Sequence, residues 1–260
     1  MTLELREVVS VDIPLSLGKV WPYLRDPALV RRWYGWDHPG LDAEVRRLFV
    51  DGAVESQDVI GDETIHTLTL PTHDRLTLRS AAHQPHRTHL TVTRRSHQGL
   101  ALFDGVRDEI DEGWIAFAHQ LQFALSIHPD QDRRTLSIFG LDAGERGNRL
   151  LDRAGLRGIH GVPVGGHVQA RRPDGTLLGG TLIYRTPLQF GLRLHGITES
   201  FLVVMETPAG TSPPHGTVDA ILSTYGLDDA TIAEVEHRWS GWWQQSVPHS
   251  RTSTAHVSSA

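Results

Sequence analysis

The chain has 260 residues, 39% of them hydrophobic, which is enough for one large domain or two compact ones. Its formal net charge is −6, and this acidic balance argues against a nucleic-acid-binding protein. Cysteine is absent, which excludes disulfides, zinc–thiolate sites and a cysteine nucleophile. The charged start, "MTLELREVVSVDIPL", does not resemble a signal peptide, and no apolar run approaches the roughly 20 residues that span a bilayer, so we expect a cytoplasmic protein.

The first half predicts a strand, two short helices, a series of strands and a long helix. Alternation of apolar and polar residues predicts the opening strand at 3–13, after which Ser16 caps one helix and Pro27 opens another. Apolar residues at helical spacing then predict the long helix, which Pro129 ends. The intervening strands are expected at 43–50, 64–70, 74–81 and 88–95, and the helix between 108 and 129.

The second half repeats this order. Its strands are expected at 133–141, 166–175, 179–186, 190–198, 200–208 and 216–226, with a short helix at 146–155 and a last helix at 228–245. The apolar stripe of the last helix lies 118 positions after that of the first long helix; it comprises Ile232, Val235, Trp239, Trp242 and Trp243, against Trp114, Phe117, Leu121, Ala124 and Leu125. This predicts two copies of one unit. The segment 248–260, rich in Ser, Thr and Ala, is expected to be a flexible tail.

Two segments resemble a known family. "VWPYLRDPALVRRWYGW" (20–36) resembles the helix pair near the start of the Activator of Hsp90 ATPase homologue proteins, and "EGWIAFAHQLQFAL" (112–125) resembles their long last helix. These proteins belong to the START/polyketide-cyclase (SRPBCC) superfamily. The resemblance implies an α+β helix-grip fold, in which a curved antiparallel sheet wraps around a long last helix. It covers about 1–130 and extends to 131–247 by element order and helix stripe, which implies two such domains in tandem.

The resemblance also implies a pocket between sheet and long helix, roofed by the short helices. Trp33 and Trp36 would then be lid and wall residues, with Trp114 in the floor; on the last helix, Trp239 and Trp243 would play a similar part. Each of these tryptophans is also compatible with a solid core or a domain interface. As a set, they favour an aromatic pocket for a small molecule.

Polar residues that interrupt apolar elements are the remaining site candidates. They are Arg79 and His119 in the first copy, and Tyr184, Arg193, His195 and Glu206 in the second. Alternation places Arg193 and His195 on one face of their strand. If that face looks inward, toward the helix of Trp239, Arg193 can hold an enolate or carboxylate and His195 can move protons. Charged residues are seldom buried unless paired, which favours the outward orientation.

Metal and cofactor chemistry finds little support. His83, His86 and His89 are evenly spaced, but Pro85 between them indicates a polar hairpin loop. We also find no nucleophile elbow, phosphate loop or dinucleotide fingerprint. We therefore expect neither a metal nor a cofactor.

Three functions remain open. The favoured one is binding of a small apolar or aromatic molecule in a helix-grip pocket, as a carrier or sensor. The second is a cofactor-independent cyclase or dehydratase acting on a polyketide-like substrate, with Arg193 and His195 as catalytic candidates. The third, implied by the family name, is an Hsp90-type co-chaperone. No nucleic acid or membrane partner is expected.

Overall fold

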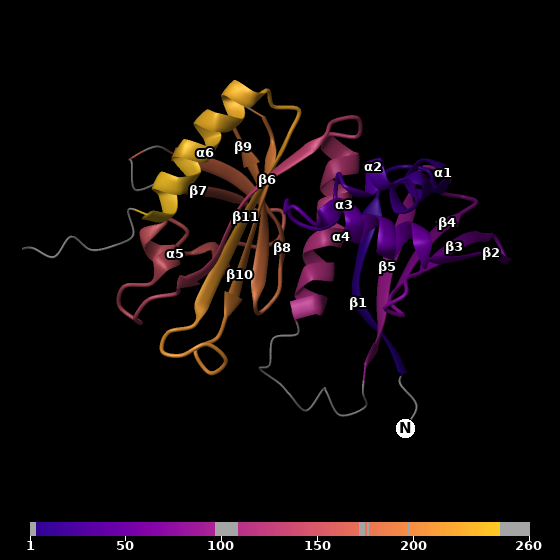
Figure 1. The fold of residues 1–260 in the computed structure, drawn as a ribbon, viewed down its shortest axis with the longest axis horizontal. Coiled ribbons are helices and arrows are strands. Elements are labelled where there is room, and N and C mark those ends of the chain that lie inside the picture. Colours follow the sequence, from indigo (N-terminus) through magenta and orange to yellow (C-terminus); the bar gives the residue numbers. More distant parts are fainter. Residues whose placement is uncertain (1–3, 97–108, 172–174, 176, 197, 245–260) are drawn as a thin grey trace, which may run out of the picture.

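The computed structural model describes residues 4–96, 109–171, 175, 177–196 and 198–244, and the predicted tail at 248–260 lies outside them. The described chain forms two separate antiparallel sheets (Figure 1). None of its helices is long and apolar enough to cross a membrane.

The first sheet has five strands in the order β1-β5-β4-β3-β2. The first strand therefore pairs with the last one, and the others form a meander in which each strand follows its neighbour. The predicted strands at 3–13, 64–70, 74–81 and 88–95 are confirmed within one or two residues. The five strands are β1 (Glu4–Ile13), β2 (Val54–Ile60), β3 (Glu63–Thr69), β4 (Arg75–Ala81) and β5 (Thr88–Ser96).

Short helices connect β1 to β2. The third of them, α2, begins at Pro27, as predicted, and the Oδ1 atom of Asp26 caps it by accepting a 2.9 Å hydrogen bond from the backbone N–H of Ala28. Ser16 stands at the N-cap of the first helix, but its side chain makes no capping bond there. These elements are α1 (Leu17–Val20), the 3-10 helix η1 (Trp21–Leu24), α2 (Pro27–Val30), α3 (Leu41–Arg46) and the π-helix η2 (Arg47–Asp51).

The predicted strand at 43–50 is wrong, because this segment is helical. Leu41, Val45, Leu48 and Phe49 are all buried, and their spacing of four, three and one residues is that of a helix face. The strand that follows, β2, was missed because all seven of its residues are exposed, so it carries no period-two burial pattern.

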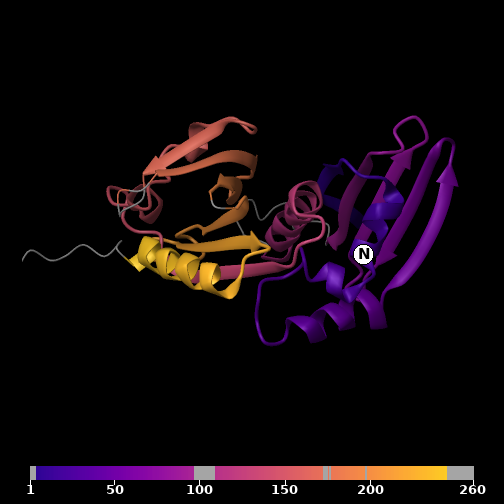
Figure 2. The ribbon, with the colours of Figure 1, turned by 90° about the horizontal axis from the view of Figure 1, so that it is seen from above.

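The long helix α4 (Glu109–Ile127) lies between the two sheets (Figures 1 and 2). One side of the helix, including Trp114 and Leu121, packs into the core of the first sheet. Its other side, including Phe123, packs with Phe201 and Ile221 of the second sheet. The helix therefore supplies apolar side chains to two cores.

The second sheet has six strands in the order β6-β11-β10-β9-β8-β7, so its first strand again pairs with its last. One face, which we call the inner face, packs against the last helix, and the opposite, outer face packs against α4. The strands are β6 (Arg133–Asp142), β7 (His167–Arg171), β8 (Leu177–Arg185), β9 (Gln189–His195), β10 (Ser200–Thr207) and β11 (Thr217–Tyr225). The helices are α5 (Leu150–Arg153), the 3-10 helix η4 (Ile159–Gly161) and α6 (Asp229–Gln244).

The two halves share a topology: strand, short helices, meander and long helix, with the first strand beside the last. This is the tandem helix-grip arrangement that the sequence resemblance implies, and the α+β fold class is confirmed. The repeated stripe of α6 is buried as predicted at Trp239, Trp242 and Trp243, which pack on the inner face of the second sheet.

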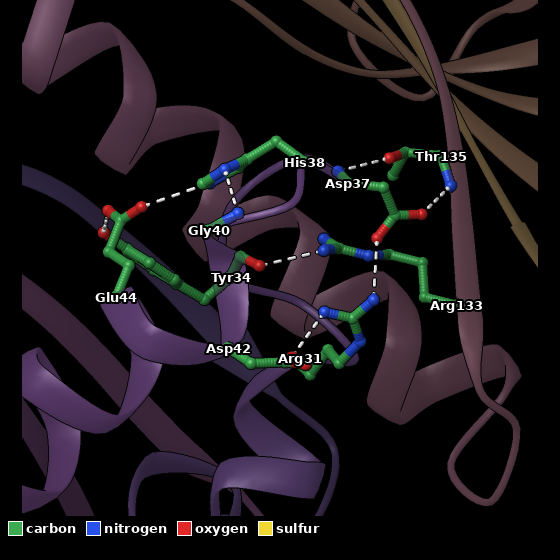
Figure 3. Close-up of polar contacts among 9 residues, drawn as sticks. All are labelled: Arg31, Tyr34, Asp37, His38, Gly40, Asp42, Glu44, Arg133 and Thr135. Carbon is green, nitrogen blue, oxygen red and sulfur yellow. Dashed lines mark hydrogen bonds and ion pairs between the residues drawn. The ribbon is translucent and has the colours of Figure 1, made fainter.

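Polar contacts also link the halves, between the loop after α2 and the start of β6 (Figure 3). Asp37 and Thr135 exchange two hydrogen bonds of 2.7 Å, each backbone N–H donating to the other's side chain. The buried guanidinium of Arg133 donates through Nη2 to the backbone oxygen of Tyr34 at 2.8 Å. Burial lowers the pKa of Arg133 from its ordinary value, because the charged form loses its hydration.

Candidate functional site

The interior of the first domain is filled by aromatic side chains. Trp33 is 0% exposed and packs edge-on against Phe49, with ring centroids 5.7 Å apart, while Tyr34 packs on Trp114 at 5.8 Å. Both indole N–H groups are satisfied, that of Trp33 by the backbone oxygen of Tyr23 at 2.8 Å and that of Trp114 by a carboxylate.

The expectation that Trp33 and Trp36 roof a pocket floored by Trp114 is therefore corrected. Trp33 and Trp114 belong to the packed core. Trp36 is partly buried and rests on Phe117 of α4, with ring centroids 4.8 Å apart. Large aromatic rings therefore pack together where the resemblance led us to expect a lid and a floor.

The second domain keeps a cavity at the corresponding place. A space of about 220 Å³, which we call the α6 cavity, lies between α6 and the inner face of the sheet. Its apolar lining includes Leu178, Leu194, Leu222, Val235, Trp239 and Trp242, and its polar lining includes His195, Thr198, Ser200, Thr224 and Arg238. Of the predicted site residues, the α6 cavity brings together only Trp239 and His195.

Trp239 gives the α6 cavity its most specific polar feature. The residue is 6% exposed, and its buried Nε1 has no hydrogen-bond partner among the described residues. By contrast, Nε1 of the neighbouring Trp242 donates to the backbone oxygen of Ala154 at 2.8 Å. A buried N–H without a partner costs about 1–3 kcal/mol, and an acceptor in this cavity would relieve that cost if a shift of the Trp239 ring brought the N–H to the cavity wall.

Trp243 is buried beside Trp242, with stacked rings 4.9 Å apart, but it does not line the α6 cavity. It belongs to the core beneath α6. The prediction that Trp243 contacts a ligand therefore has no support in the geometry of this cavity.

The structure separates the predicted pair: Arg193 lies on the other face of the sheet, whereas His195 borders the α6 cavity. Phe190, Leu192 and Leu194 pack on the inner face, so alternation along β9 turns Arg193 outward. Nη2 of Arg193 contacts both carboxylate oxygens of Glu199, at 2.5 and 2.6 Å. This hydrogen bond is the main reason that the pKa of Glu199 is lowered. The hypothesis that Arg193 faces the helix of Trp239 is wrong.

His195 ends β9 at the border of the α6 cavity. Its Nδ1 lies 3.4 Å from Glu199 and its Nε2 lies 3.1 Å from the hydroxyl of Thr181. These contacts hold the imidazole at the end of β9, close in sequence to the outward-facing Arg193.

His119 and Tyr184 lie together between α4 and the outer face of the second sheet. Their rings are stacked, with centroids 4.0 Å apart. Burial lowers the pKa of His119 to about 4, and its Nδ1 has no partner in the described part of the chain. The hydroxyl of Tyr184 donates to Gln189 at 2.6 Å, and burial raises its pKa well above the usual value. His119 and Tyr184 thus belong to a packed part of the domain interface.

The two remaining predicted residues lie elsewhere. Arg79 is exposed on β4, where its Nη1 lies 3.5 Å from Glu63. Glu206, near the end of β10, lies 3.4 Å from Nε2 of His160 and lines a separate cleft of about 680 Å³. Neither reaches the α6 cavity. In the described ranges no group of three His, Asp or Glu side chains is placed to hold a metal ion.

Sequence reasoning missed most of the lining of the α6 cavity. Leu178, Leu194 and Leu222 were expected only as strand residues, because period-two burial does not distinguish a cavity wall from solid core. Trp242 was predicted on the apolar stripe of α6. That stripe was the sequence feature that could have indicated this wall of the cavity.

No family model matches the chain, and no curated protein matches it. Solved structures with similarity include two di-domain ARO/CYC proteins, BexL of the BE-7585A biosynthetic pathway and StfQ of the steffimycin pathway. Each is 12% identical with a TM-score of 0.31; BexL covers 94% of both chains, and StfQ covers 92% of this chain and 94% of its own. DynU16, from the dynemicin biosynthetic locus, is 16% identical over 93% of this chain and 96% of its own, with a TM-score of 0.27. At these low values, the strand order and the cavities carry the conclusions below.

Proposed function

We propose that this protein binds a small apolar or aromatic molecule in the α6 cavity, as a carrier or sensor. The observation that carries the proposal is a mostly apolar space walled by Trp239, whose buried N–H has no partner among the described residues. Small-molecule sites combine apolar walls with a few placed polar groups, and this cavity has both.

The volume limits the ligand. About 220 Å³ lies below the roughly 300–1,000 Å³ of pockets for drug-sized molecules, but above the roughly 150 Å³ cavity that accepts benzene. We therefore propose a ligand portion of one or two rings that carries a hydrogen-bond acceptor, such as a carbonyl or phenolic oxygen, opposite Trp239.

A cofactor-independent cyclase or dehydratase is the second candidate. It is favoured by His195, because an imidazole that borders the cavity and contacts Glu199 and Thr181 is oriented for proton transfer. Arg193, the other proposed catalytic residue, is paired with Glu199 on the outer face. Binding is therefore better supported than catalysis.

The test compares 2-naphthol with naphthalene, two probes that differ by one oxygen, in titrations followed by tryptophan fluorescence. We expect 2-naphthol to bind the natural protein about two- to tenfold more tightly, the range for one net hydrogen bond. Trp239→Phe keeps an aromatic ring but removes the N–H, so it should abolish that difference.

The control is Trp21→Phe, because Trp21 packs on His66 in the first domain, away from the α6 cavity. Val235→Trp, which fills the cavity, should weaken both probes. An unchanged preference for 2-naphthol in Trp239→Phe, or binding that survives Val235→Trp, would overturn the proposal.

A further inference from the structure

A third and larger cavity lies between the two domains. It measures about 780 Å³ and is bounded by the end of β1, the turn between β4 and β5, α4, and strands β8 and β9. We call it the interdomain cavity. Its apolar lining consists of Ile13, Pro14, Pro85, Phe123, Ile127 and Ile183.

The interdomain cavity is separate from the α6 cavity. Ile183 and Arg193 reach it from the outer face of the second sheet, whereas the α6 cavity lies on the inner face. The two cavities share no lining residue. The sheet itself stands between them.

The charged side chains of the interdomain cavity are mainly cationic. Arg87 comes from the first domain and Arg193 from the second, and Asp12 is the one carboxylate in the described lining. With neutral histidines the lining carries a formal charge of +1, although the whole chain carries −6. One cavity thus presents cations from two domains, in a protein that is otherwise acidic.

Both guanidinium groups have donors to spare. Nη2 of Arg193 is bound to Glu199, while its Nη1 makes no hydrogen bond to a described residue and the side chain is 33% exposed. Nη2 of Arg87 contacts Asp12 at 2.5 Å, and Asp12 is shared with Nδ1 of His89 at 3.1 Å. Because a guanidinium has five N–H donors, each arginine can bind a further acceptor without releasing its carboxylate.

We propose that the interdomain cavity binds an amphipathic organic acid: a flat apolar body carrying a carboxylate or another fixed anionic group. The apolar body lies on Phe123 and Ile183, and the anionic group lies between Arg87 and Arg193. The volume falls within the roughly 300–1,000 Å³ of sites for such molecules. A molecule bound there contacts both domains at once.

Two fluorescent probes test this. 1-Anilinonaphthalene-8-sulfonate carries an apolar aromatic body and an anion, and N-phenyl-1-naphthylamine has the same body without the anion. We expect the natural protein to bind the sulfonate about tenfold more tightly, since hydrogen bonds to charged groups are the stronger class. Arg193→Gln and Arg87→Gln should each remove most of that preference, while Arg79→Gln, the exposed arginine of β4, should leave it unchanged.

A blocking variant keeps the test valid if Arg193→Gln fails to fold. Ser126 is exposed on α4 and lines the interdomain cavity, so Ser126→Trp should fill it without disturbing the core. We expect at least tenfold weaker binding of the sulfonate in Ser126→Trp and unchanged binding in Val235→Trp, which fills the α6 cavity. Equal affinity of the natural protein for the two probes would overturn the proposal. Sulfonate binding that is unchanged in Ser126→Trp but weakened in Val235→Trp would overturn it as well.

Discussion

The imidazole of His119 lies flat against the phenol ring of Tyr184, with centroids 4.0 Å apart and ring planes 4° apart. One ring belongs to α4 and the other to β8, so this stack joins the first domain to the second. Burial keeps the imidazole neutral, because its pKa falls from 6.5 to about 4.

This relationship predicts that acid destabilises the protein through His119. Below pH 6.5 the unfolded chain takes up a proton that the folded state accepts only near pH 4, so stability is lost as the pH falls through this window. The full loss from this group is about 3 kcal/mol. Urea unfolding of the natural protein and of His119→Phe, from pH 7.5 to 4, measures it. His119→Phe keeps a stacked ring without a titrating group, and should lose less stability over that range; parallel pH profiles for the two proteins would contradict this.

A second prediction concerns Gly191, opposite the bulge that carries Tyr184. A Cβ atom there would collide with the ring of Tyr184 and lie 2.9 Å from Phe201. Gly191→Ala should therefore lower the free energy of unfolding by about 1–3 kcal/mol, the usual effect of overpacking. The matched control is Gly179→Ala on β8, where a Cβ meets nothing within 4 Å. Equal midpoints in urea for both variants would show that the rings move aside freely.

Trp33 provides a test of the first core. Its ring is fully buried, and its N–H is bonded to the backbone oxygen of Tyr23. We expect Trp33→Ala to cost about 3–5 kcal/mol, as for other buried aromatic residues. Trp21→Ala should lower the free energy of unfolding by clearly less, because Trp21 is only partly buried. If Trp33 were a ligand lid, Trp33→Ala would instead leave the unfolding midpoint nearly unchanged and reduce binding alone.

The proposed domain division at 130/131 predicts different behaviour for the two fragments. Fragment 1–130 contains the whole first sheet and α4, and should unfold cooperatively. Fragment 131–247 leaves the outer face of the second sheet uncovered, including Phe201, Val203 and Ile221, which pack on α4 in the full chain. We expect it to self-associate in sedimentation experiments, because large exposed apolar patches drive association. A monomeric second fragment with native-like stability would contradict this.

The sequence predicted the fold well where one face of an element is buried. The alternation in β1 and the apolar stripes of α4 and α6 follow from the burial of one face, so the types and limits of these elements were predictable. Prediction failed at α3, where "AEVRRLFV" fits a strand or a helix, and at β2, where nothing is buried.

The site was less predictable than the fold. Alternation placed Arg193 and His195 on one face, but a single strand does not reveal which helix that face meets. In this molecule both faces of the second sheet meet a helix, α6 on the inner face and α4 on the outer face. The expectation that a side chain points inward therefore did not say which helix it would meet. The tryptophans posed the same difficulty, because the residue type is the same at positions 33 and 239. Only the neighbouring side chains in the fold decide that Trp33 fills the core of its domain and that Trp239 borders a cavity.

The position of α4 also constrains how the chain can vary. Most of α6 that does not face its sheet is exposed, as at Glu234, Glu236 and His237, whereas α4 is buried or half-buried from Asp111 to Leu125. A substitution on α4 must suit two cores built by different segments of the chain, and a change that improves one can damage the other. Among homologues, α4 should therefore accumulate substitutions more slowly than α6, and its changes should coincide with compensating changes in β10 and β11.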